Sequence, residues 1–223
     1  PKRVIRSGER PLHALRERGV EYVEVRLMDL DPFETVGINA TTMRFLDVFL
    51  LHCVLSDSAQ DTPNEIAALA RNQHLTAAQG REPGLKLDRN GEAVSLVDWG
   101  LTIIDECLPI ARSIDAALAT GALHVEAVEA ARRSLQHPDT LPSARVLRAM
   151  ADEHENSFVR FVRTRSVQTR DALLAMPLTP EQADRQRRMV EDSVRAQREI
   201  EASDTTPFEE FRKQYVSAGR LVV

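Results

Sequence analysis

The chain has 223 residues, of which 43% are hydrophobic and 28% are charged, and its formal net charge is −5. These fractions are typical of a globular protein that is long enough to bury a sizeable core. The net negative charge and the aromatic content of only 4% argue against a nucleic-acid partner, which requires a basic and base-stacking surface. No apolar run reaches the length that crosses a bilayer.

The segment over residues 19–33 begins with Val, Tyr and Leu side chains that are typical of a half-buried β-strand. Side chains alternate across a strand, so Tyr22, Glu24 and Arg26 are expected to share one face. The opposite face then carries apolar side chains that can pack on a core. The pattern therefore predicts a carboxylate beside a guanidinium on a rigid element.

The pair Glu24 and Arg26 has two interpretations. A carboxylate can hold Mg²⁺, and a guanidinium can bind phosphate through two parallel hydrogen bonds. Together these groups suit phosphoryl transfer, in which placement and charge neutralisation do most of the catalysis. The alternative is an ordinary salt bridge on a solvated sheet face.

Beyond about residue 39 the pattern indicates one helix after another, which predicts an α+β fold that is predominantly α-helical. A short helix is also expected before the strand, at residues 12–18. The later helices are predicted over residues 41–57, 63–80, 95–120 with Pro109 breaking or kinking it, 124–136 and 142–174, and after capping boxes at Thr179 and Thr206. A turn is predicted at residues 88–91.

Two further expectations concern burial. The helix over 41–57 is apolar nearly all round, which predicts that it is deeply buried and that Cys53 is a buried thiol. Cys53 and Cys107 match no zinc pattern, and a disulfide between them is not expected.

The charged stretch over 185–201 is typical of a solvated helix, or of one packed on a larger protein.

A series of short motifs follows in order along nearly the whole chain. They are Ser7-Gly8-Glu9-Arg10-Pro11, Ala14-Leu15, residues 19–26, Asp29, Asp31-Pro32-Phe33, Arg44-Phe45-Leu46-Asp47, Cys53, residues 80–85, Ser143-Ala144-Arg145-Val146-Leu147 and Asp204-Thr205-Thr206-Pro207-Phe208. In this order they resemble the bacterial class of glutamate–cysteine ligases, also called γ-glutamylcysteine synthetases.

The resemblance implies an ATP-dependent enzyme that joins the γ-carboxylate of L-glutamate to the amine of L-cysteine through γ-glutamyl phosphate. This is the first step of glutathione biosynthesis, and it implies a cytoplasmic location. The family's fold is similar to that of the glutamine synthetases. Residues 1–38 are then expected to contribute a short strand to the catalytic sheet, and residues 39–223 to form a helical C-terminal body.

The resemblance also assigns roles to residues. Glu24 is expected to be a metal ligand, and Arg26 to steady the transferred phosphoryl group. Arg6, Tyr22 and Val23 are expected to contact the nucleotide, although the turn after Arg6 has the alternative role of only reversing the chain. The implied cofactors are ATP and roughly two or three Mg²⁺ ions in the complete site, with Mn²⁺ as a substitute.

The resemblance covers only the C-terminal portion of a longer enzyme. The family's other metal-binding carboxylates are expected in a missing N-terminal catalytic portion, so this piece alone is expected to be inactive. Two other functions stay open: a non-catalytic helical interaction or scaffold domain, and a related carboxylate–amine ligase with another amine acceptor.

Overall fold

The computed structural model describes residues 2–6, 9–58 and 60–216. The chain forms two compact units: one comprises Pro1–Asp29 with Ala175–Val223, and the other is Leu30–Leu174. The α+β, mostly helical class is confirmed. The division into residues 1–38 and residues 39–223 concerns the role of each part in catalysis and stays a prediction.

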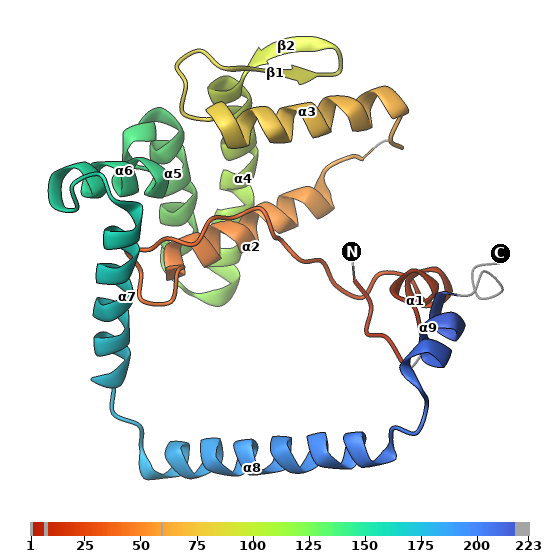
Figure 1. Cartoon of the computed structure of the whole chain (residues 1–223). Helices are drawn as coiled ribbons and strands as arrows, with labels where there is room; N and C mark the ends of the chain where they lie inside the picture. Colours follow the sequence, from red (N-terminus) through yellow and green to blue (C-terminus); the bar gives the residue numbers. More distant parts are fainter. Residues whose placement is uncertain (1, 7–8, 59, 217–223) are drawn as a thin grey trace. The chain divides into compact units, whose positions relative to one another are not determined.

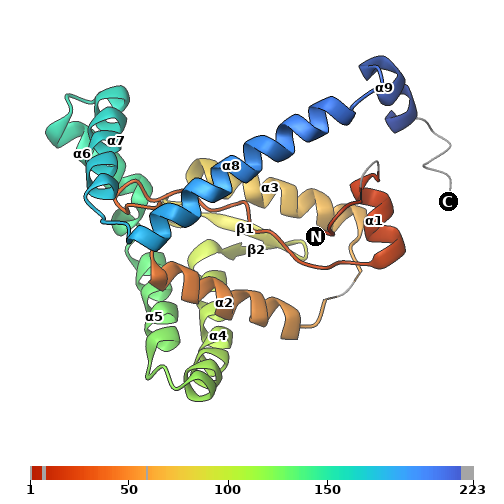
Figure 2. The ribbon, with the colours of Figure 1, turned by 90° about the horizontal axis from the view of Figure 1, so that it is seen from below.

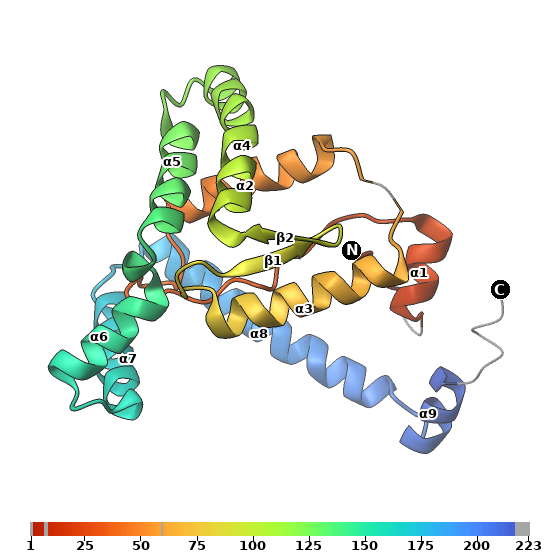
Figure 3. The same cartoon turned by 90° about the horizontal axis from the view of Figure 1, so that it is seen from above.

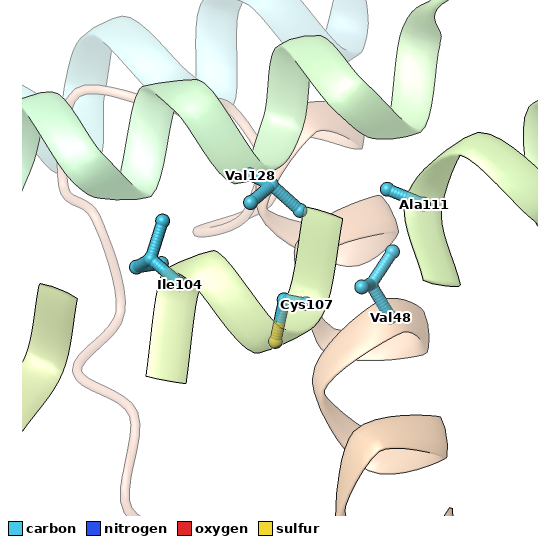
Figure 4. Close-up of a cluster of buried hydrophobic side chains, with 5 residues drawn as sticks. All are labelled: Val48, Ile104, Cys107, Ala111 and Val128. Atoms are coloured by element: carbon cyan, nitrogen blue, oxygen red, sulfur yellow. The ribbon is translucent and has the colours of Figure 1, made fainter. Parts of the chain in front are cut away.

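The larger unit is built around three helices, α2 (Ala40–Leu55), α4 (Leu96–Leu118) and α5 (Leu123–Gln136), which pack together as Figure 1 shows. Their buried side chains form one cluster, drawn in Figure 4: Val48, Ile104, Cys107, Ala111 and Val128. Gly100 lets α4 approach α5 closely, because a Cβ there would lie 2.8 Å from a methyl carbon of Leu135. The α4 helix continues through Pro109, where a break or kink was predicted.

Local caps explain where several helices begin. The side chains of Asn39, Thr62 and Ser95 each accept a backbone hydrogen bond at the start of α2, α3 (Pro63–Gln79) and α4. The α5 helix is capped from a distance, since the buried carboxylate of Asp115 in α4 accepts the backbone N–H groups at its first turn. Burial alone would raise the pKa of Asp115, but these bonds and the Thr120 hydroxyl hold it well below its usual value.

A β-hairpin stands where only a turn was predicted. Strands β1 (Lys86–Arg89) and β2 (Glu92–Ser95) pair antiparallel, with Lys86 opposite Ser95. The two residues between them, Asn90 and Gly91, have φ values of 57° and 85°. Asn-Gly is the preferred sequence for such a turn, so this signal could have found the hairpin. Figure 3 shows the hairpin beside α3 and the start of α4.

The long helix predicted over residues 142–174 is wrong. The chain instead forms two helices, α6 (Pro142–Glu153) and α7 (Phe158–Leu174), both labelled in Figure 2, and the short 3₁₀ helix η1 (Pro138–Thr140) precedes them. Glu155 and Asn156 adopt left-handed backbone conformations between them, with φ values of 51° and 58°. After this reversal α7 leaves α6 in a new direction (Figure 1), and Phe161 in α7 is buried against Phe33 and His154.

A loop of the larger unit is clamped by two arginines. The guanidinium carbons of Arg145 and Arg165 lie 4.0 Å and 5.0 Å from the ring centroid of Phe33. Arg145 also pairs with Asp31 at 3.1 Å, and Phe33 contacts the buried ring of Phe161. Two motifs that lie far apart in the sequence, at residues 31–33 and 143–147, thus meet in space.

The expected deep burial of the first long helix is wrong. Within α2 only Val48 is buried, and its C-terminal end is open: Leu51, Val54 and Leu55 are 43%, 78% and 71% exposed. The reason is that α4 and α5 pack on the side of α2 that carries Val48, so apolar side chains that point away from these two helices stay open. Cys53 is accordingly exposed, whereas burial raises the pKa of Cys107 to about 11; both thiols are free.

The smaller unit contains α1 (Pro11–Arg18), α8 (Pro180–Ser203) and α9 (Phe208–Val216). The predicted capping box at Thr179 is confirmed, with Gln182 as its partner. No residue of α8 is buried among those that the structure describes. In the same described residues, no helix combines the length and the apolar content needed to cross a membrane.

Candidate functional site

The segment that carries the predicted site is extended, but it is not a regular strand. Its contact within the chain is an isolated antiparallel bridge, in which the backbones of Lys2 and Tyr22 exchange hydrogen bonds of 2.8 Å and 3.2 Å. The prediction that most of residues 19–33 forms a strand is therefore wrong for the described residues. A strand requires a neighbour along its length, and the described residues supply one only at Tyr22.

The apolar side chains of this segment are open to solvent. Val20, Val23, Val25, Leu27 and Leu30 are between 44% and 77% exposed. The backbone groups of residues 23–30 form no backbone hydrogen bond with any other described residue. An unpaired, extended segment with exposed apolar side chains has the properties of a sheet strand whose partners are not among the described residues.

Glu24 and Arg26 do share one side of the extended segment. The Nε and Nη2 atoms of Arg26 lie 2.7 Å and 2.5 Å from Oε2 of Glu24, and Nζ of Lys2 lies 3.8 Å from the same oxygen. The hydrogen bond from Arg26 lowers the pKa of Glu24, and the charge of Lys2 adds to the effect. The Arg26 side chain is 74% exposed, so one carboxylate and two cations stand together at the surface.

The other predicted contacts, Arg6, Tyr22 and Val23, all precede this pair in the chain. Tyr22 and Val23 are 45% and 57% exposed, and the backbone of Tyr22 is held by Lys2. The backbone N–H of Arg6 donates to Glu9 at 2.8 Å, and its side chain is exposed. The turn at Ser7 and Gly8 lies outside the described residues.

Sequence reasoning missed the ion pair that fixes this region. Arg18 donates to both carboxylate oxygens of Glu9, at 2.7 Å and 2.8 Å, and also to the backbone carbonyl of Val4. Through Arg18, α1 is tied both to Val4 and to Glu9. The hydrogen bond from Arg18, helped by the backbone of Arg6, lowers the pKa of Glu9 to about 2.

We expect the Glu9–Arg18 pair to make this region acid-sensitive. Because the pKa of Glu9 is lower in the folded chain, its stabilisation is present above about pH 4.5 and is lost as the pH falls towards about 2. As the pH falls through that window, residues 2–6 of the wild type should lose protection against hydrogen exchange. The Glu9→Gln variant lacks the charge at every pH, so its protection should not change across the window. Glu17→Gln is the matched control and should behave like the wild type. Equal acid responses in wild type and Glu9→Gln would contradict the assignment.

The described residues alone do not make a metal centre. No group of at least three His, Cys, Asp or Glu side chains comes together among them. Glu24 can offer one carboxylate, whose Oε2 is engaged by Arg26 and Lys2. Neither Glu24 nor Arg26 lines the shallow hollow along α8 or the one between α3 and the hairpin.

Comparison with known proteins identifies relatives. A family model described as glutamate-cysteine ligase matches residues 1–76. The glutamate–cysteine ligase of Bordetella parapertussis is 42% identical over 219 residues, and that of Pseudomonas putida is 38% identical over 215 residues. The alignments cover 98% and 96% of this chain and 41% of each relative, so the chain spans about two fifths of their length.

A solved structure agrees with these matches. It is the glutamate–cysteine ligase of Francisella tularensis in complex with AMP, with a TM-score of 0.82 and 30% sequence identity. The match covers 98% of this chain and 43% of that one. The resemblance inferred from the ordered motifs is thereby confirmed.

Proposed function

Because this chain is homologous to the glutamate–cysteine ligases over nearly its whole length, we propose that it is the C-terminal portion of such a ligase and carries part of its ATP-dependent active site. The observation that carries the proposal is the 42% identity over 98% of the chain, which includes the segment with Glu24 and Arg26. That segment presents charged groups on one side and an unpaired backbone, as a piece of a larger catalytic sheet would.

The proposed reaction joins the γ-carboxylate of L-glutamate to the amine of L-cysteine, in the cytoplasm, as the first step of glutathione synthesis. ATP transfers its γ-phosphoryl group to the glutamate carboxylate, which gives γ-glutamyl phosphate and ADP. The amine of cysteine then attacks the acyl carbon, and inorganic phosphate leaves. Both steps concentrate negative charge on phosphoryl oxygens.

Arg26 is proposed to bind those oxygens. Its guanidinium is planar, always charged and 74% exposed, so it is available to a phosphate group from outside the chain. Its present partner is Glu24, whose lowered pKa keeps the carboxylate ionised at neutral pH. Arg26 can turn from Glu24 to the phosphoryl group when a cation takes its place on the carboxylate.

Mg²⁺, when bound, would offset charge on the nucleotide phosphates. In this chain Glu24 would supply one ligand, and the remaining ligands would come from outside the described residues. Arg6, Tyr22 and Val23 are proposed to lie along the nucleotide, because Tyr22 and Val23 directly precede Glu24 in the chain and all three residues are open to solvent.

The missing part of the ligase is proposed to pair with residues 23–30. Their free backbone donors and acceptors can add to the edge of a sheet, and their exposed apolar side chains can pack on its core. The chain alone is accordingly proposed to be inactive.

The proposal is tested by reconstitution. The chain is fused to the part of the Bordetella parapertussis ligase that it does not cover, and phosphate release from ATP is measured with Mg²⁺. We expect release only when L-glutamate and L-cysteine are both present, and none from the unfused chain. Release that needs glutamate with a different amine would indicate a related ligase. No release from a folded fusion would overturn the proposal in favour of a scaffold.

A further inference from the structure

The larger unit contains a polar hollow, and the residues that line it lie far from residues 22–26 in the sequence. It has a volume of about 630 Å³ and is enclosed by the first part of α3, the tip of the hairpin and the start of α4. Ligand-binding pockets commonly have volumes of several hundred Å³, and they combine apolar walls with a few polar groups. Here the walls include Ala68 and Leu69, and the charged groups are Glu65, Arg71, Asp88 and Arg89.

The frame of this hollow is fixed by hydrogen bonds. The side chain of Asn72, which is 8% exposed, donates to the backbone carbonyl of Asp88 at 2.7 Å and accepts its N–H at 2.9 Å. The Asp88 carboxylate in turn accepts from Gly91 and from Arg71. The hairpin tip is therefore held against α3, and the charges of Asp88 and Arg71 satisfy each other.

The guanidinium of Arg89 has N–H groups that are free to bind a ligand. Its guanidinium carbon lies 5.2 Å above the ring centroid of Trp99, the one tryptophan of the chain. Stacking on an aromatic ring orients a guanidinium while leaving its N–H groups free to bind a carboxylate. Among the described residues, Arg89 forms no ion pair with any carboxylate.

Glu65 has the complementary property. It stands in the first turn of α3, it is half-buried, and its backbone N–H is taken up by the cap residue Thr62. Its carboxylate pairs with no cation among the described residues. The hollow is thus lined by an unpaired anion, Glu65, and by an unpaired cation, Arg89, which is stacked on Trp99.

We propose that this hollow binds a free α-amino acid as a zwitterion, with the ligand's carboxylate on Arg89 and its ammonium group on Glu65. A zwitterion satisfies both charges at once, whereas a simple anion would leave Glu65 unpaired and a simple cation would leave Arg89 unpaired. The apolar wall at Leu69 would contact methylene groups of the ligand's side chain. This site is separate from Glu24 and Arg26, and it does not depend on the ligase activity.

Trp99 supplies a direct readout on the unmodified chain. L-Glutamate is titrated while the fluorescence of Trp99 is recorded, and glutarate, which lacks only the amino group, is titrated in parallel. We expect a saturable change with L-glutamate. Arg89→Gln should weaken it on the order of tenfold or more, because a charge-assisted contact is lost. Glu65→Gln should weaken L-glutamate binding but should not weaken glutarate binding, because glutarate has no ammonium group to pair with Glu65.

Arg81→Gln removes an exposed arginine of the turn before β1 and is the matched control. This variant should bind L-glutamate as the wild type does. The absence of a saturable fluorescence change with L-glutamate would overturn the proposal. So would an Arg89→Gln variant that binds L-glutamate normally, or a glutarate affinity equal to that of L-glutamate.

Discussion

Replacing Arg26 with Lys in the reconstituted ligase is expected to lower turnover by about 10³-fold while the fold stays intact. The side chain is 74% exposed, and among the described residues its hydrogen bond and ion pair are with Glu24, so its loss removes little packing. Lys keeps the positive charge but cannot make the planar, two-point contact with a phosphoryl group. The measurement is the rate of phosphate release with glutamate and cysteine at saturation.

Two further variants make the Arg26 result specific. Arg16→Lys changes an exposed arginine on α1 and should leave the rate unchanged. Glu24→Gln should instead shift the magnesium titration to higher concentrations, because one ionised ligand is lost. Near-normal turnover in Arg26→Lys would remove this residue from the site. An unchanged magnesium titration in Glu24→Gln would remove the metal assignment.

Replacing Phe161 with Ala is expected to cost about 3–5 kcal/mol of unfolding free energy in the larger unit. The ring is 1% exposed and contacts the rings of Phe33, His154 and Phe158. Its removal leaves a cavity beneath the loop that Arg145 and Arg165 clamp. Urea unfolding followed by far-ultraviolet circular dichroism measures the change.

Phe158→Ala is the matched control for this experiment. Phe158 lies on the same helix, but its side chain is 59% exposed, so the same truncation should cost far less. The two variants compare the same chemical change at a buried and an open position. Equal losses for both would contradict the inference that Phe161 anchors the loop to α7.

Features that depend on neighbouring residues were predictable. Thr179 and Gln182 form the capping box that their spacing indicates, and helices start near residues 41, 63 and 124 as predicted. Asn90-Gly91 carries an equally local signal for the hairpin, which sequence analysis passed over. The reversal at Glu155 and Asn156 has no comparable signal, because neither residue favours the left-handed conformation as strongly as glycine does.

The site was predictable only in part. The alternation that places Glu24 and Arg26 on one side holds for any extended chain, so their contact followed from a spacing of two residues. Whether that chain forms a strand depends on neighbours that the described residues do not supply. The clamp on Phe33, the pair of Glu9 with Arg18 and the hollow beside Trp99 join residues that no local pattern connects.

For this protein the sequence by itself determined the helical character, most helix starts and the likeness to the glutamate–cysteine ligases, since these depend on short-range backbone preferences and on the order of motifs. Tertiary structure alone decided which apolar faces are covered. Val48 is buried and Leu55 is open on the same helix, because burial depends on which distant element packs there and not on the residue's own hydrophobicity.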